Sequence, residues 1–147
     1  MLTYKEILFA TTKLLKKNFK CDIVVDSLQQ NFEEECFYVT LEPVSTIGIS
    51  RTFNKKTLLI SIKYFNDKDK IFLYDKANEL EKIFFRKLKV DDRFLEISNV
   101  EANFINDEVG AMLDFLVTLE FTDIDLENDL EEKEEYDLMQ ELYLKNQ

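Results

Sequence analysis

Residues 111–121 constrain the fold most tightly, because uniformly apolar positions alternate there with mixed, mainly polar ones. Successive side chains of a β-strand point to opposite faces, so this pattern predicts a strand with one buried face. The apolar positions are Ala111, Leu113, Phe115, Val117, Leu119 and Phe121. A strand of this kind needs a sheet whose apolar face is covered by other elements. We expect Phe115, Val117 and Leu119 to pack against Leu80 and Phe84.

Two helices and four further strands complete the prediction. The first helix, at about 3–18, opens with Thr3 and Glu6 in the spacing of a capping box. The second, at about 69–88, carries one apolar stripe formed by Leu73, Ala77, Leu80, Phe84 and Leu88. Strands are predicted at 21–26, 36–42, 58–65 and 93–105.

The expected order of elements is α-β-β-β-α-β-β-α, a single α+β domain with two helices packed on a mainly antiparallel sheet. Pro43 indicates either a strand end or a sheet edge. The segment 45–57 either extends its two flanking strands into a long hairpin or forms a loop. Asn106–Gly110 is expected to be a hairpin loop. We divide the chain into a folded domain, 1–121, and an acidic C-terminal extension, 122–147.

The C-terminal extension holds ten acidic and two basic residues, a formal charge of −8 within a total of −11. Its acidic spacing from Asp123 faintly resembles a calcium-binding loop, but Asn128 stands where such a loop needs Gly. A solvated acidic linker is the favoured interpretation. Beyond it, Leu138, Met139 and Leu142 form a short apolar stripe. It predicts a helix that docks on a neighbouring subunit, with docking on the parent domain or disorder in the free monomer as the alternatives.

The absent residue types argue against an enzyme. The chain has no His, two Gly and one Pro, which excludes imidazole catalysis, histidine metal sites and glycine-rich nucleotide loops. Cys21 and Cys36 are expected to be free thiols, and the pairs Asp91/Asp92 and Asp67/Asp69 to cap or turn the chain. We therefore predict no catalytic residue, no cofactor and no metal.

Charge and hydropathy bear on location and partners. A formal charge of −11 argues against general nucleic-acid binding, which depends on Lys and Arg. The sequence has neither an apolar run long enough to span a membrane nor a signal-peptide pattern at its start. These features predict a soluble protein of a reducing cytoplasm.

The candidate contact residues are basic, aromatic and apolar. Arg51, Lys55 and Lys56 form a basic cluster in the segment 45–57, either as a docking arm or as a solvated hairpin tip. Tyr4, Tyr38 and Tyr64 are assigned either to the core or to a subunit interface. With Leu138, Met139 and Leu142, these residues make up the candidate interface.

Several short segments resemble the tail terminator proteins of phages and of phage-like tailocins from low-GC Gram-positive bacteria. The resemblance covers about residues 3–125 and does not reach the acidic extension. The segments that carry it are Thr3–Leu8, Leu14–Phe19, Phe37–Pro43, Ile62–Phe65, Tyr74–Leu80 and Leu119–Phe121.

The resemblance implies a structural role. Proteins of this family form rings, expected to be hexamers, that bind the head-proximal end of a tail tube and stop its growth. The implied partners are further copies of the chain, the tail tube, the sheath of a contractile tail and, in a complete phage, the head connector. The protein would lie in the bacterial cytoplasm during assembly and then in the tail particle. The alternatives are another neck or head–tail adaptor component and, less favoured, an acidic DNA mimic that inhibits a basic protein.

Overall fold

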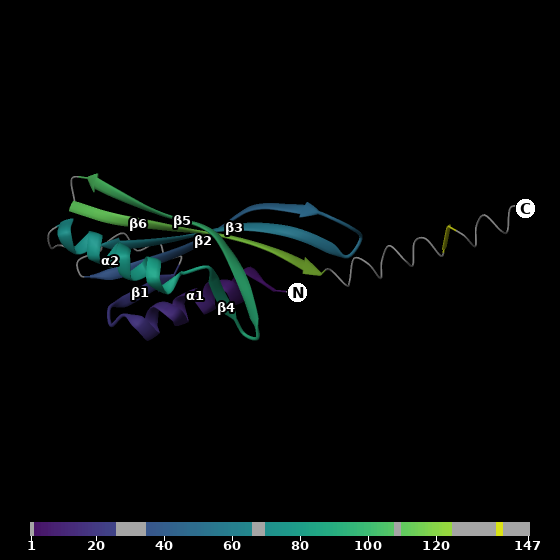
Figure 1. The fold of residues 1–147 in the computed structure, drawn as a ribbon, viewed down its shortest axis with the longest axis horizontal. Coiled ribbons are helices and arrows are strands. Elements are labelled where there is room, and N and C mark those ends of the chain that lie inside the picture. The colour runs from purple at the N-terminus through teal and green to yellow at the C-terminus, as the bar shows by residue number, and fades with distance from the viewer. Residues whose placement is uncertain (1, 26–34, 66–69, 108–109, 125–137, 140–147) are drawn as a thin grey trace, which may run out of the picture.

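The computed structural model describes residues 2–25, 35–65, 70–107, 110–124 and 138–139 (Figure 1). Two helices and six strands make up these ranges. In chain order they are α1 (Tyr4–Asn18), β1 (Asp22–Val25), β2 (Cys36–Gly48), β3 (Phe53–Phe65), α2 (Lys70–Ile83), β4 (Lys87–Val90), β5 (Arg93–Asp107) and β6 (Gly110–Ile124).

The six strands form one sheet in the order β1-β2-β3-β6-β5-β4. Only β1 and β2 run parallel, and every other neighbouring pair is antiparallel. Both helices contribute side chains to a single hydrophobic core on one face of the sheet. The predicted α+β class and mainly antiparallel sheet are therefore confirmed.

Helix α1 begins where the sequence predicts. The Thr3 hydroxyl accepts a hydrogen bond from the Glu6 backbone N–H at 3.2 Å, and the Glu6 carboxylate accepts one from the Thr3 N–H at 3.4 Å. This capping box satisfies backbone donors that have no partner inside the helix. Ile7 and Leu15 are fully buried, which fixes the face that α1 turns to the sheet.

The alternating apolar side chains of β6 form part of the hydrophobic core. Leu113, Phe115, Val117 and Leu119 are all fully buried, and the Phe115 and Phe84 ring centroids lie 6.2 Å apart. Leu80 belongs to the same buried cluster. The expected packing of β6 against the second helix and the residue that follows it is confirmed.

The second helix is shorter than predicted. It ends at Ile83, and residues 87–90 form strand β4 instead of a last helical turn. Arg86, between the helix and β4, takes a left-handed conformation with φ 65°, which a continuing helix would not allow. Leu88 continues the helical stripe, yet the pair Leu88 and Val90 also alternates as a strand, and both side chains are buried beside β5. Asp91, at φ 52°, makes the turn from β4 into β5, where Asp is tolerated.

The segment 45–57 is a hairpin. Strand β2 runs through Pro43 to Gly48 and pairs with β3 down to Gly48 opposite Asn54, with a register shift between Pro43 and Ser45. Among the described residues, β1 covers β2 only as far as Val39, so Pro43 lies where β2 is an edge strand of the described sheet. The sheet-edge interpretation of Pro43 and the long-hairpin interpretation of 45–57 are thus the ones the structure bears out.

Strand β6 continues to Ile124, three residues beyond the predicted end of the folded domain. Of the extension after it, the structure describes residues 138 and 139 alone, so the proposed calcium-like spacing falls mostly outside the described residues. In the described part of the chain, neither helix has the length and hydrophobicity that crossing a membrane requires.

Candidate functional site

The outer half of the β2–β3 hairpin, residues 44–57, is called the arm below. Every residue from Glu42 to Arg51 is exposed, and no residue of the arm is buried. In Figure 1 the hairpin extends beyond the helices, and the end of β6 runs alongside β3. Since helices cover only the body of the sheet, both faces of β2 are open to solvent along the arm.

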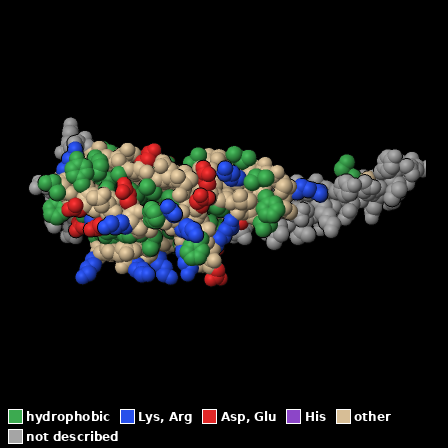
Figure 2. Space-filling view, viewed as in Figure 1, with side chains coloured by type: hydrophobic (Ala, Val, Ile, Leu, Met, Phe, Trp, Pro, Cys, Tyr) green, Lys and Arg blue, Asp and Glu red, His purple; other side chains and the backbone are tan. Residues whose placement is uncertain are grey.

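Apolar side chains gather on the arm. The exposed ones there and on the adjoining end of β6 are Val44 (61%), Ile47 (57%), Ile49 (60%), Phe53 (43%) and Ile124 (44%). Ile47 pairs with Lys55 and Phe53 pairs with Ile124, which puts Ile47, Phe53 and Ile124 on the sheet face that carries no helix. Figure 2 shows hydrophobic and basic side chains close together at this end of the molecule. Clustered exposed apolar side chains mark interaction surfaces.

The three basic residues are separated by the pleat of the strand. Lys55 points to the helix-free face, where its Nζ lies 3.8 Å from the Glu120 carboxylate. Lys56 points to the opposite face, and its Nζ lies 5.4 Å from the centre of the Tyr4 ring. Arg51 is exposed at the tip. The residues share one arm, but the sequence interpretation of a single cluster missed this division between faces.

Tyr64 is a correction to the candidate interface. It is 1% exposed, its ring centroid lies 5.0 Å from that of Phe37, and its hydroxyl donates a hydrogen bond to the Glu35 carboxylate. Tyr64 faces the core because it shares a sheet face with Ile62 and Ile60, which lie beneath the helices. Tyr38 lies on the other face opposite Lys63 and is half-buried, and Tyr4 is 38% exposed.

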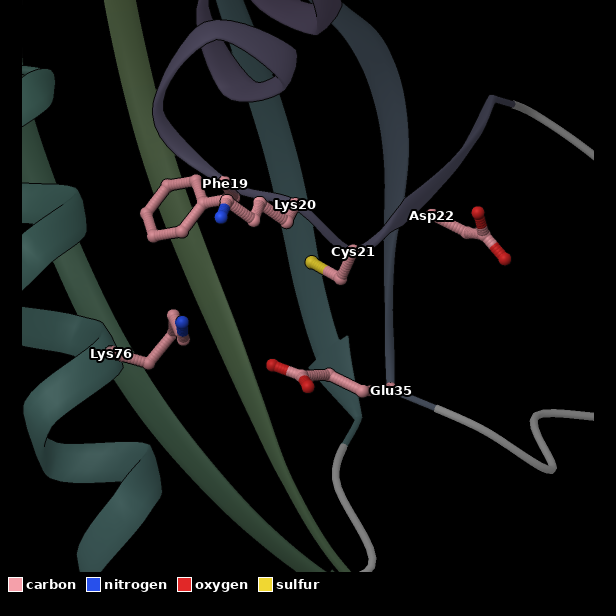
Figure 3. Close-up of a pocket in the computed structure, with 6 residues that line it drawn as sticks. All are labelled: Phe19, Lys20, Cys21, Asp22, Glu35 and Lys76. Carbon is pink, nitrogen blue, oxygen red and sulfur yellow. The ribbon is translucent and has the colours of Figure 1, made fainter.

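A polar pocket lies beside Tyr64, where α2 approaches the start of β1 and β2 (Figure 3). Lys76 of α2 and Glu35 point toward each other across it, and the Cys21 sulfur points into the same pocket. The Lys76 Nζ lies 4.6 Å from the Phe19 ring centre and 5.0 Å from that of Tyr64. This cation–π arrangement fixes α2 against two aromatic rings of the core.

The two thiols near this pocket are poorly suited to nucleophilic chemistry. Burial raises the pKa of Cys21, and the nearby Glu35 carboxylate raises it further. Burial and Asp22 likewise raise the pKa of Cys36. The thiolate is the reactive form, so both residues remain as protonated packing groups. Among the described residues, no group of three Cys, Asp or Glu is placed to hold a metal ion.

Asp123 is a residue whose role sequence reasoning missed. It was assigned to the acidic extension, yet it is 4% exposed and accepts hydrogen bonds from the Leu2 N–H at 3.0 Å and the Arg93 guanidinium at 3.2 Å. Arg93 also donates to the Thr122 carbonyl. Burial alone would raise the pKa of Asp123, but the Ile124 and Leu2 N–H groups and the Arg93 charge outweigh it and lower the pKa. Asp123 thus joins the N-terminus and β5 to the end of β6, where it pairs with Asn54 of the arm.

The remaining candidate residues lie after β6. Leu138 and Met139 are helical and 61% and 70% exposed. Leu142 is outside the described residues. Arg51, Lys55 and Lys56 therefore all lie on the arm. Tyr38 lies on the helix-free face of the sheet, and Tyr64 lies in the core.

The apolar residues of the arm were not among the candidates. The signal that could have found them is the uncharged run Pro43–Ser50, which contains Val44, Ile47 and Ile49 without a charge to keep it in water. An edge strand of that kind is a ready site for pairing with another chain.

Comparison with known proteins identifies the family. A search of curated proteins finds no match. Among solved structures, one chain superposes with a TM-score of 0.54 at 12% identity, covering 86% of this chain and 98% of its own, which supports the fold alone. The sequence model of the family described as phage tail terminator protein matches residues 6–131, which include α2, all six strands, the arm and all but the first two residues of α1. The chain belongs to the phage tail terminator family.

Proposed function

We propose that the protein forms a ring on the head-proximal end of a phage-like tail tube and stops the polymerisation of that tube. The observation that carries the proposal is the family match over residues 6–131, which includes nearly all of the folded domain. The family is one of structural proteins of the phage tail. In a complete phage the ring would then present a surface to the head connector, and in a headless tailocin it would close the tube.

The geometry supports a subunit that acts by shape and self-association. A rigid body, with a core of Phe115, Phe37, Tyr64 and many aliphatic side chains, carries an arm with exposed apolar residues. A closed ring needs a head-to-tail contact, in which two different surfaces of the same chain meet. The proposed partners are therefore further copies of the chain and the tube end, with six copies as the expected number.

Deletion of the gene tests the proposal. If the protein stops tube growth, tails from the deletion strain should be longer and more variable than normal, and a plasmid copy should restore their length. Electron microscopy of purified tails measures this directly. Tails of normal length that fail to join heads would instead assign the protein to a head–tail adaptor. The DNA-mimic alternative has less support because most of the negative charge lies after residue 121 rather than on the folded domain.

A further inference from the structure

The outer face of α1 is basic. Ile7 and Leu15 are fully buried, which turns the opposite face of the helix to solvent. The exposed side chains of that face are Lys5, Phe9, Lys13, Lys16 and Lys17. Residues three and four apart are neighbours on a helix, so these positions form one continuous surface, called the lysine stripe below. Figure 2 shows Lys and Arg side chains gathered along the lower margin of the molecule, where Figure 1 places α1.

The lysine stripe has no acidic side chain to balance its charge. Glu6 is the one acid of α1, and its carboxylate accepts a hydrogen bond from the Thr3 N–H at the helix start. Among the described residues, no ion pair involves a lysine of α1. Lys13 lies three and four positions from Lys16 and Lys17, and like charges at these spacings weaken a helix. An acidic partner on this face would remove that repulsion.

Charge complementarity points to the C-terminal segment of the chain as the partner. Residues 3–20 hold five lysines and one acid, a formal charge of +4, whereas residues 21–124 hold twelve basic and twenty acidic side chains, a formal charge of −8. Residues 125–147 hold nine acidic and two basic side chains, a formal charge of −7. The arm is also basic, but Lys55 and Lys56 point to opposite faces of it, whereas the four lysines of α1 share one face. Attraction between opposite charges therefore directs the acidic segment to α1.

The segment is long enough to reach a second copy, and its own domain does not cover its described residues. Thirteen residues, 125–137, separate the end of β6 from Leu138. This length spans ~20 Å as a helix and ~40 Å when extended. Leu138 and Met139 are 61% and 70% exposed, so both side chains are open to contact with another chain. Phe9, 55% exposed in the middle of the lysine stripe, provides an apolar surface for them.

We propose that residues 125–147 of one copy bind the lysine stripe on α1 of a second copy of this chain. The carboxylates of the segment pair with the lysines, and Leu138 and Met139 pack against Phe9. Because the segment and the stripe are different surfaces, the contact repeats head to tail and adds one copy at each step. Its role in a ring rests on the proposed function, and the contact uses neither strand of the arm.

Two double variants test the two sides of the contact. K13E/K16E reverses two charges of the lysine stripe, and E131K/E134K reverses two charges of the acidic segment. Sedimentation of the purified full chain at concentrations up to about 1 mM gives the readout. Wild type should associate, and each double variant should associate at least ~10-fold more weakly. A mixture of the two variants should form a 1:1 dimer and nothing larger, because one chain keeps the lysine stripe and the other keeps the acidic segment.

Two controls separate this contact from a general effect of charge. K70E/K82E makes the same change in net charge as K13E/K16E, at exposed positions of α2, and should associate like wild type. F9D replaces the exposed Phe of the lysine stripe and should weaken association at least ~5-fold. Its matched control is F94D, which replaces a Phe that is 61% exposed and also lies beside lysines, and which should associate like wild type. Each variant of an exposed residue should melt within about 3 °C of the wild type.

Three results would overturn the inference. They are a wild-type chain that stays monomeric throughout, a K13E/K16E protein that associates like wild type, and a mixture that forms no dimer. If K13E/K16E associates normally but loses binding to a double-stranded DNA probe that the wild type binds, the lysine stripe is a nucleic-acid site instead. None of these results bears on whether the protein stops tube growth, which tail length in the deletion strain reports separately.

Discussion

The body of the sheet and the arm are built from the same strands and differ in what covers them. In the body, β3 carries Ile60 and Ile62 beneath the helices, and both are fully buried. A few residues earlier the same strand carries Phe53 and Lys55, both exposed. The strand pattern persists along both parts, but burial of the apolar face ends where the helices end. The body therefore stabilises the fold, and the exposed arm is the part that we propose contacts a partner.

The largest expected effect contrasts Phe115→Ala in the body with Ile47→Ala on the arm. Phe115 is fully buried against Phe84, so its truncation should lower the free energy of unfolding by ~3–5 kcal/mol. Ile47 is 57% exposed, and its truncation should change that free energy by less than ~0.5 kcal/mol. Urea unfolding of both variants measures the difference. Similar losses in the two would show that the arm belongs to the monomer's core.

The end of β6, which pairs with the arm, should show an intermediate effect. Asp123→Asn removes a buried carboxylate that accepts hydrogen bonds from the Leu2 N–H and from Arg93, and we expect a loss of ~1–3 kcal/mol at pH 7. Asp92→Asn, at an exposed turn, is the matched control and should be nearly neutral.

The effect of Asp123 should depend on pH in a definite direction. Its folded pKa lies below the ordinary value of 3.8, so the charged form stabilises the fold above that value, and this stabilisation is lost as the pH falls through the lower folded pKa. The difference between wild type and Asp123→Asn should therefore be constant near neutral pH and shrink in strong acid. A difference that grows on acidification would mean that Asp123 is not held as the charged form.

How far the sequence predicts these regions depends on how local the determining contact is. The capping box of Thr3 and the alternating pattern of β6 depend only on residues close together in the sequence, and both were predicted. The end of α2 was not predicted, because Leu88 fits the helical and the strand pattern equally well. Only its pairing with Leu95 shows that it belongs to a strand. Asp123 was also misassigned, since its partners Leu2 and Arg93 lie far away in the chain.

The candidate site shows the same limit. The hairpin and its basic residues follow from the local sequence, but strand pairing puts Lys55 and Lys56 on opposite faces. The sequence left Tyr64 open between the core and a subunit interface, and the sheet decides for the core because this face lies under the helices. Exposure of Val44, Ile47 and Ile49 depends on how far the helices reach along the sheet, which no short pattern encodes.

The smallest expected effect sharpens the division between the two faces of the arm. Lys55→Glu breaks an exposed ion pair with Glu120, and Lys56→Glu removes a cation beside the Tyr4 ring. Each should lower the free energy of unfolding by less than ~1 kcal/mol. Both should weaken self-association, because each reduces the positive charge of the arm. Thermal melting measures the stability of the two variants, and sedimentation measures their self-association. If self-association is unchanged in both, the basic residues of the arm only keep it solvated.

The most direct test of the account is the length of tails made in a deletion strain that expresses I47D/I49D at the wild-type level. We expect a folded, soluble variant whose tails are as long and as variable as those of the deletion strain, while F94D restores normal length. Tails of normal length with I47D/I49D would contradict the claim that the arm provides the contact on which tail termination depends.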